Sequence, residues 1–251
     1  MEKEKPIICI GLPHRGASVS LGAAFGWLKW PSRNHQHIAI DVSTSLLAYS
    51  FNILWATALN MRRSHGVTHF AMLHDDITPA RYWVDTLMAE MQAYEADVVS
   101  TVIPLKSALG LTSTGIESHD IWKPRRLTMQ EIARLPETFS IADTDQPGSQ
   151  LLINTGCFLV NLQRPWCDQV AFHMRDAIIR DKEGTYTAVV QPEDWVFSRY
   201  LAEYKCRVFA TRKVRVQHIG EQAYENWGSW GKWKQDQPQI ATIGAIGSLS
   251  Q

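Results

Sequence analysis

The sequence lacks an excess of charge of either sign, because 25 lysines and arginines balance 25 aspartates and glutamates across 251 residues. A protein that binds nucleic acid mainly through the phosphate backbone is normally basic. The balance therefore argues against that class. Two short segments, "IWKPRRL" (121–127) and "TRKVRV" (211–216), still mix basic with aromatic or apolar residues. They could track a phosphate backbone locally, and solvated strand faces explain them equally well.

Long hydrophobic runs and paired cysteines are also missing. No apolar stretch is long enough to cross a bilayer, and the start "MEKEKPIICIGLP" lacks the architecture of a signal peptide. The four cysteines (Cys9, Cys157, Cys167 and Cys206) are scattered, without a C-x-x-C pair. This favours reduced, buried thiols over a disulfide framework. We therefore expect a cytoplasmic protein without a membrane span.

The composition that remains is ordinary for a globular protein, with 45% hydrophobic and 20% charged residues. The length suits one large domain or two small ones. Because no linker and no internal repeat interrupts the chain, we predict a single domain over residues 1–251, with two merged halves that meet near residue 105 and a tail from residue 221.

The first 105 residues alternate between apolar strands and amphipathic helices. Strand patterns lie at residues 6–13, 37–42, 68–73 and 96–105, and a long helical pattern lies at 45–65. This alternation predicts an α/β fold with a parallel, doubly wound sheet. After residue 105 the rhythm breaks. There we expect loops, a short helix near 128–135, a strand pair or bent strand at 149–162, helices at about 165–180 and from Pro192, and late strands between 206 and 220.

Candidate functional residues follow the predicted strands, and the carboxyl ends of strands are where such sheets bind ligands. Residues 14–16 ("HRG") follow the first strand, Asp41 ends the second, and His74-Asp75-Asp76 follows the third. Two adjacent carboxylates repel each other, and a divalent cation is the usual compensation. The competing explanation is that an aspartate caps a helix near Pro79, where Thr78 is a rival cap.

Three further sites stand out in the second half. Glu193 and Asp194 lie in the first turn of a predicted helix, where the helix dipole stabilises acids in any case. The segment 154–156 ("NTG") interrupts an apolar stretch, and its glycine would let a ligand approach the backbone, although a bend in a core strand explains it equally well. His218 ends an alternating strand, and a lone histidine there is usually a satisfied polar residue.

Four segments, in this order along the chain, resemble the GT-A fold glycosyltransferases, and the inverting, family 2-like members in particular. "FAMLHDDI" resembles the Asp-x-Asp signature, and "NTGCFLVNLQRPW" resembles the strand that borders the sugar and acceptor site. "PEDWVFSRYLAEYKCRVFAT" resembles the Glu-Asp helix start, and "VRVQHIG" contains the late histidine. The resemblance covers about residues 5 to 235. It implies a mostly parallel central sheet flanked by helices, with a smaller mixed-sheet acceptor half.

The resemblance also implies an activity, a cofactor and roles for the halves. Residues of about 5–105 would form a nucleotide-sugar half, 106–220 an acceptor and catalytic half, and 221–251 a lid or tail. The enzyme would move a sugar from a nucleotide-diphosphate sugar, UDP-linked as the first choice, to an acceptor hydroxyl. Mn²⁺ or Mg²⁺ would offset the charge on the departing diphosphate.

The implied metal ligands are Asp76 as the main ligand and His218 as the second. Asp75 would lie on the ribose or in the metal's water shell. His74 stands where the family has its first aspartate, so the sequence departs from the signature at that ligand. For an inverting transfer, the "PEDW" helix start makes Asp194 the candidate base, with Glu193 as its alternative.

The resemblance also suggests residues for the two substrates. The nucleotide candidates are Pro13, Arg15, Asp41 and Asn52. The sugar and acceptor candidates are Asn154, Thr155, Gly156, Trp195, Trp227 and Trp230. The last two belong to "HIGEQAYENWGSWGKWK", whose glycines and tryptophans are typical of a mobile lid, and sealing the core is the competing role for these rings.

Several alternatives stay open at this level. A retaining GT-A transferase shares the late histidine segment and the N-x-G strand. A phage enzyme that glycosylates hydroxymethylpyrimidine bases in DNA is one specific acceptor case, and a saccharide is another. A non-catalytic nucleotide-sugar-binding module would keep the pocket without turnover. A metal-dependent phosphohydrolase is suggested by His-Asp pairs at residues 74–75 and 119–120, but such enzymes place those ligands on helices. The oligomeric state is open.

Overall fold

The computed structural model describes residues 5–14 and 19–233. The helices are α1 (Leu21–Leu28), α2 (Leu47–His65), α3 (Trp83–Ala93), α4 (Met129–Ile132) and α5 (Glu193–Glu203), with 3-10 turns η1 (Ile141–Asp143) and η2 (Pro165–Gln169). The strands are β1 (Ile7–His14), β2 (Gln36–Ser43), β3 (Val67–Leu73), β4 (Ile77–Pro79), β5 (Val98–Thr101), β6 (Leu111–Ile116), β7 (Arg125–Thr128), β8 (Thr138–Phe139), β9 (Leu151–Leu152), β10 (Cys157–Asn161), β11 (Arg175–Arg180), β12 (Tyr186–Gln191), β13 (Val208–Thr211), β14 (Val216–Ile219) and β15 (Ala223–Glu225).

Local sequence signals set several of these boundaries. Ser20 caps α1, because its hydroxyl accepts a hydrogen bond from the Ala23 backbone N–H at 3.1 Å. Gly66 ends α2 in the left-handed conformation with φ 67°, which a glycine adopts without a steric penalty. A reciprocal capping box between Thr128 and Glu131 starts α4. These local signals fix the residues at which the helices between the strands begin and end.

The central sheet has seven strands in the order β2-β1-β3-β10-β5-β13-β8. β1 pairs in parallel with β2 and β3, and β13 pairs in parallel with β5. β10 lies antiparallel between β3 and β5, and β8 is antiparallel to β13. Half of the neighbouring pairs are therefore antiparallel. The sheet is a mixed α/β sheet, where the sequence led us to expect a mostly parallel one.

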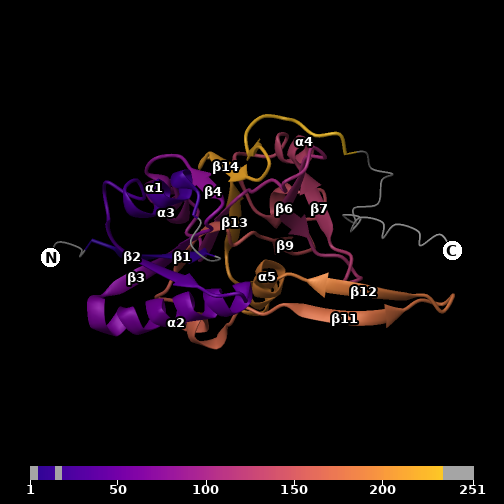
Figure 1. Ribbon diagram of the computed structural model, residues 1–251, viewed down its shortest axis with the longest axis horizontal. Coiled ribbons are helices and arrows are strands. Elements are labelled where there is room, and N and C mark those ends of the chain that lie inside the picture. The colour runs from indigo at the N-terminus through magenta and orange to yellow at the C-terminus, as the bar shows by residue number, and fades with distance from the viewer. Residues whose placement is uncertain (1–4, 15–18, 234–251) are drawn as a thin grey trace.

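Apolar side chains on opposite faces of this sheet form two core clusters. Phe70 and Met72 of β3 face the cluster that contains Phe51, Leu54 and Trp55 of α2 and Phe197 of α5. Ala71 and Leu73 of the same strand face the cluster built on α3, from Trp83 to Met91. This alternation is the period of two expected for a strand buried on both faces, and it gives three layers, with α2 on one side and α3 on the other (Figure 1).

Three smaller sheets complete the described part of the chain. They are β7-β6-β9, β15-β14-β4 and the two-stranded β11-β12. All of their pairings are antiparallel, so the second half carries antiparallel sheets where we expected a mixed one. β11 and β12 form a hairpin that projects from the body beside α5 (Figure 1). None of the described helices is long and apolar enough to span a bilayer.

One expected element is wrong. The helix predicted from Pro165 to Arg180 lasts only for the 3-10 turn η2, and the chain then enters β11. The segment 149–162, expected as a strand pair or a bent strand, contains two strands, β9 and β10, which belong to different sheets. The short helix near 128–135 is present as α4. The error matters for the shape of the protein, because it turns a packed helix into a projecting hairpin.

Candidate active site

The sequence-predicted residues from distant segments meet at one edge of the central sheet. β3 ends at Leu73, and His74 to Asp76 follow it there. Because β10 runs antiparallel and pairs Cys157 with Leu73, the segment that precedes β10 reaches the same edge. The backbone N–H of His74 donates to the carbonyl of Gly156 at 2.8 Å. The topology thus joins the "HDD" and "NTG" segments directly.

Asp76 lies at the centre of a charged cluster at this edge. Its Oδ2 is 2.5 Å from the Lys106 ammonium and 3.4 Å from Nε2 of His218. Burial alone would raise the pKa of this carboxyl, but the hydrogen bonds from His218 and Lys106 outweigh it and hold the pKa well below its usual range. Asp76 is therefore an anion throughout the physiological pH range.

His218 is oriented by the backbone. Its strand β14 pairs with β4, which brings His218 opposite Ile77, next to Asp76. Its Nδ1 lies 2.7 Å from the carbonyl oxygen of Pro104. A backbone carbonyl accepts, so Nδ1 carries a hydrogen and Nε2 faces the carboxylate of Asp76. This second partner on the far ring nitrogen is the arrangement that metal-binding histidines use.

A buried amide supports the strand that carries His218. Asn226 is fully buried, and its Oδ1 accepts from the backbone N–H of Val216 at 2.9 Å. Its side-chain N–H groups donate to the carbonyls of Val102 and Val214, at 3.1 and 2.9 Å. The amide therefore connects β14 to the segment after β5, and this segment also contains Pro104 and Lys106.

His74 lies behind this cluster as a neutral imidazole. Burial lowers its pKa to about 4, in spite of the nearby negative charge of Asp76. Its ring packs on Phe51, with 5.0 Å between the ring centroids. Within the described residues, neither its Nε2 nor Oδ1 of Asp76 has a hydrogen-bond partner, although both atoms are buried. Buried polar atoms left in this way are rare and call for a ligand or a water.

These side chains fit a divalent cation to a limited degree. A carboxylate and an imidazole suit Mn²⁺ better than Mg²⁺, which prefers oxygen ligands alone. Asp76 and His218 supply two protein ligands, and no group of three or more histidine, cysteine, aspartate or glutamate residues with metal-binding geometry occurs in the part of the chain described. A cation held here would need its remaining ligands from a substrate and from water. The Lys106 ammonium on Oδ2 would compete with it for the charge of Asp76.

Asp194 lies at the buried first turn of α5. It is 8% exposed, and burial together with the negative charge of Glu193 raises its pKa to about 8. Its Oδ1 accepts from the Trp195 backbone N–H at 2.8 Å, and its Oδ2 lies 3.5 Å from the side-chain nitrogen of Asn154. This carboxyl therefore differs in charge state from Asp76 at neutral pH.

Asn154 links this carboxyl to the sheet edge. Its Oδ1 accepts from the backbone N–H of Gly156 at 2.6 Å, and the carbonyl of Gly156 accepts from His74. A β-carbon on Gly156 would lie 2.8 Å from that Oδ1 and 3.1 Å from the Ile103 side chain, so a larger residue would have to push the Asn154 side chain away. Thr155 between them is buried at 1% exposure. The "NTG" segment thus bridges the two candidate halves of the site.

Arg126 is a neighbour of Asp194 that our sequence-based prediction missed. Its guanidinium lies over the Trp195 ring at 4.2 Å from the centroid, and its positive charge opposes the rise in the pKa of Asp194. The Trp195 indole N–H donates to the carbonyl of Ser113 at 3.0 Å, and the residue is 5% exposed. The Trp195 ring, which we expected to contact the sugar or the acceptor, is therefore covered by other side chains and packs inside the protein.

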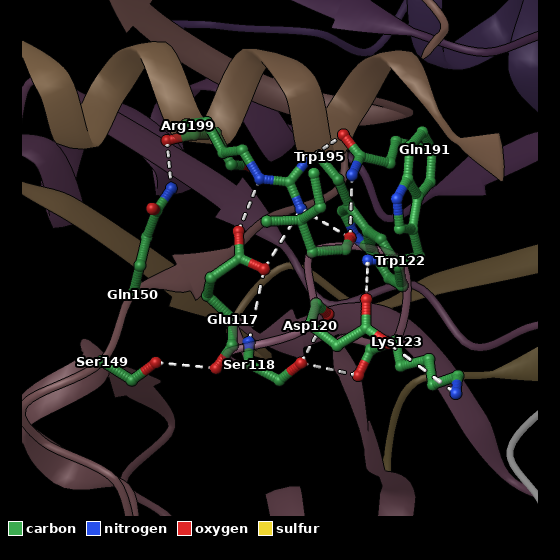
Figure 2. A network of polar contacts seen from close by, with 12 residues as sticks. Glu117, Ser118, Asp120, Trp122, Lys123, Ser149, Gln150, Gln191, Trp195 and Arg199 are labelled. Atoms are coloured by element: carbon green, nitrogen blue, oxygen red, sulfur yellow. Dashed lines mark hydrogen bonds and ion pairs between the residues drawn. The ribbon is translucent and has the colours of Figure 1, made fainter. Parts of the chain in front are cut away.

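A polar network on the following turns of α5 fixes the helix in place (Figure 2). The Arg199 guanidinium donates to both carboxylate oxygens of Glu117, at 2.5 and 3.1 Å. It also donates to the side-chain oxygen of Gln191 at 2.5 Å and to the Ile121 carbonyl at 3.2 Å. Such a two-pronged pair is geometrically specific. It ties the base of the hairpin and the loop around residue 121 to the helix that carries Asp194 in its first turn.

Only some of the residues that we predicted to bind the nucleotide lie near this site. Pro13 is a buried member of β1, and Asp41 on β2 is paired with His14 at 3.2 Å. Both lie toward the carboxyl ends of their strands, Pro13 on β1 beside β3 and Asp41 on β2, one strand farther from it. Arg15 lies outside the described residues. The Asn52 side-chain amide makes two hydrogen bonds with the Phe172 backbone, at 2.7 Å each. These bonds occupy the groups that we expected to contact a nucleotide base.

The tryptophans of the expected lid are anchored. The Trp230 indole N–H donates to the Glu225 carbonyl at 2.9 Å, and its ring packs against the larger core cluster. The Arg215 guanidinium lies 5.9 Å from the centroid of the Trp227 ring. Gly231 crosses Gly110 so closely that a β-carbon on either would lie within 2.5 Å of the other segment's backbone. The expected lid beyond residue 233 lies outside the described residues.

Lys106 and Pro104 are the main additions that the structure makes to the site. Both follow β5, so the strand-end rule that singled out residues 74–76 could have found them. A separate cavity of about 640 Å³ lies beside β7 and α4, and it includes Arg125, Arg134 and Trp233 in its lining. Its lining contains none of the predicted site residues, so it is not the site described here.

No protein-family model matches the sequence, and no curated protein matches it. Among solved structures, the chain is similar to A197 from STIV, with a TM-score of 0.51 and 14% identity, over 92% of this chain and 99% of that one. Weaker likenesses include apo-UDP-glucose pyrophosphorylase, with a TM-score of 0.36 and 9% identity, over 88% of this chain and 74% of that one. Another is the UDP-N-acetylglucosamine pyrophosphorylase from Trypanosoma brucei, with a TM-score of 0.30 and 14% identity, over 61% of this chain and 32% of that one. The first of these likenesses extends over nearly the whole of both chains, and it shows that this chain shares the α/β fold of A197.

Proposed function

We propose that this protein is a metal-dependent glycosyltransferase that moves a sugar from a nucleotide-diphosphate sugar to an acceptor hydroxyl with inversion. The observation that carries the proposal is that the segment 154–156 connects two unlike carboxyls, Asp194 through Asn154 and the Asp76 loop through the hydrogen bond between His74 and Gly156. Asp76 is held ionised by cations, whereas Asp194 is held protonated by burial. A site that contains two carboxyls with well-separated pKa values can use the ionised one to bind positive charge and the other one to transfer protons.

In this proposal Asp76 and His218 would hold a divalent cation, which would offset the charge of the departing diphosphate. Asp76 would supply the negative oxygen, and His218 would supply Nε2 because Pro104 occupies its other nitrogen. The Lys106 ammonium, which now pairs with Asp76, would be available to a donor phosphate oxygen. UDP is the nucleotide we place first, and the acceptor is left open.

Asp194 acts as the base in this proposal. In its ionised form, which a pKa of about 8 leaves as the minor form at neutral pH, it takes the proton of the acceptor hydroxyl while that oxygen forms the new bond to the anomeric carbon and the bond to the diphosphate breaks. A base whose pKa lies near the working pH combines a useful ionised fraction with a strong pull on the proton. Asn154 positions the carboxyl, since its side-chain nitrogen faces Oδ2.

The proposal is tested by ligand-dependent melting. UDP, GDP, dTDP, CMP and their sugars are each added with and without Mn²⁺. A ligand that binds only the folded state raises the melting temperature, so one nucleotide should raise it and only with Mn²⁺ present. Asp76→Asn should abolish that shift. Asp168→Asn is the matched control, because Asp168 also pairs with a cation, Arg62, but outside the site.

Catalysis is tested separately from binding. Asp194→Asn should keep the nucleotide shift and lose sugar transfer, which is followed as release of the nucleoside diphosphate. A normal transfer rate in that variant would remove Asp194 as the base. No shift with any nucleotide, with or without Mn²⁺, would refute the transferase proposal as a whole.

A further inference from the structure

The hairpin of β11 and β12 is a feature that the candidate site does not use. The two strands pair with each other over six residue pairs, from Arg175 opposite Gln191 to Arg180 opposite Tyr186, and with no other strand in the described chain. The hairpin extends away from the body (Figure 1). A two-stranded hairpin is marginally stable by itself in water. An arm of this kind is therefore expected to have a partner.

One face of the hairpin is apolar and open to solvent. The register places three cross-strand pairs on that face: Asp176 with Val190, Ile178 with Ala188, and Arg180 with Tyr186. Ile178 is 76% exposed, Tyr186 67% and Val190 56%. These six residues are the hairpin face. Clustered exposure of large apolar side chains marks an interaction surface more often than scattered exposure does.

The charges on the hairpin face are arranged symmetrically about its centre. Asp176 and Arg180 lie two residues before and two residues after Ile178, on the same side of β11. The Arg180 guanidinium lies over the Tyr186 ring at 5.4 Å, which keeps it on this face. A surface with an acid and a base at equal distances from an apolar centre is complementary to itself when it is reversed.

We propose that the hairpin face binds the same face of a second copy of this chain, about a two-fold axis that crosses both strands at the Ile178–Ala188 pair. Each Ile178 then meets its counterpart. Each Asp176 faces the partner's Arg180, and each Val190 faces the partner's Tyr186. An axis along the strands would instead place Asp176 over the partner's Val190, without charge pairing, so the charges select the first arrangement.

The size of the face sets the strength of the association. Six residues at 3.3 Å per residue and two strands give a face of roughly 20 by 10 Å, about 200 Å². Stable interfaces bury about 800 Å² per partner. Because the strands of the two copies run in opposite directions, each hairpin tip (181–185) lies toward the partner's body, which adds area. The dimer should therefore form reversibly, in the micromolar range.

The proposal is tested by sedimentation velocity on the full chain, from about 1 µM to about 500 µM. The average mass should rise with concentration from 28.5 kDa toward twice that value. Ile178→Asp should weaken the association about tenfold or more. Thr187→Asp is the matched control, because Thr187 is exposed on the opposite face of the same hairpin, and it should leave the association unchanged.

Charge exchange separates this arrangement from any other contact. Asp176→Arg alone and Arg180→Asp alone should each weaken self-association, because each places like charges opposite one another. An equimolar mixture of the two single variants should associate again, since one copy then presents two arginines and the other two aspartates. A chain that stays at 28.5 kDa throughout, an Ile178→Asp variant that still dimerises, or a mixture that fails to recover would each overturn the proposal.

Discussion

Replacing Asp194 by asparagine should stabilise the protein, and the gain should grow with pH. The carboxyl is buried at the start of α5, and its pKa is raised from 3.8 to about 8. Below pH 3.8 both the folded and the unfolded chain hold the proton. As the pH rises from 3.8 to 8, the unfolded chain releases it while the folded chain does not, so stability is lost across that window.

The size of the effect follows from the two pKa values. Each pH unit within the window costs about 1.4 kcal/mol, so the accumulated loss at pH 7 is about 4 kcal/mol. Asparagine has the shape of the protonated acid and does not titrate. Its carbonyl can still accept from the backbone N–H of Trp195. Asp194→Asn should therefore equal the wild type near pH 4 and exceed it by about 4 kcal/mol at pH 7.

Urea unfolding of the wild type and the variant at half-unit steps from pH 4 to pH 8.5 measures this difference. Contributions from all other carboxyls are common to both chains and cancel in the difference. In a chain of 251 residues, 4 kcal/mol corresponds to a melting-temperature shift of roughly 8–16 °C at pH 7. A difference that stays flat between pH 4 and pH 8 would refute the burial argument and, with it, the distinct charge states of the two carboxyls.

Three further predictions concern the supports of the site. Lys106→Met removes the ammonium that pairs with an oxygen of Asp76, so the variant should bind Mn²⁺ about tenfold more tightly than the wild type. Titration followed by electron paramagnetic resonance measures both affinities. Equal affinities would show that Lys106 does not compete with the cation. Gly156→Ala places a β-carbon 2.8 Å from the neighbouring amide oxygen and should lower the free energy of unfolding by about 1–3 kcal/mol in urea. Asn226→Ala breaks three hydrogen bonds of a fully buried amide and should lower the free energy of unfolding by about 3 kcal/mol. The control Asn60→Ala, at an exposed position of α2, should change that free energy little. Equal losses in the two variants would show that the buried amide does not support the site.

The sequence predicted where buried strands lie better than it predicted their directions. Apolar runs identify the strands, and residues 74–76 follow the third of them as expected. The structure adds that residues 154–156 lie at the same edge. The direction of β10 could not be read in the same way. A strand buried on both faces shows a continuous apolar run whichever way it runs, so only the pairing of Cys157 with Leu73 reveals that it is antiparallel.

The hairpin shows where periodicity misleads. A helix was expected at about 165–180, and Val170, Met174 and Ala177 do lie at helical spacing there. The composition argues for strands instead, because residues 175–191 contain several β-branched side chains on either side of a glycine turn. Gly184 has φ 89° in that turn. Arg126, the neighbour of Asp194, was missed for another reason, since a single basic residue on the short strand β7 has no pattern of its own.

The placement of β10 also dictates an order of events when the chain folds. Residues Val98–Thr101 have no pairing with β3, and the gap between these strands is filled only by Cys157–Asn161. The centre of the sheet therefore cannot close on the ribosome until residue 161 has emerged, and two strand edges stay open until then. Such long-range pairing slows folding and exposes the chain to aggregation. A fragment that stops at residue 105 would keep those edges permanently, so the first half of the chain depends on the later half to become a folded unit.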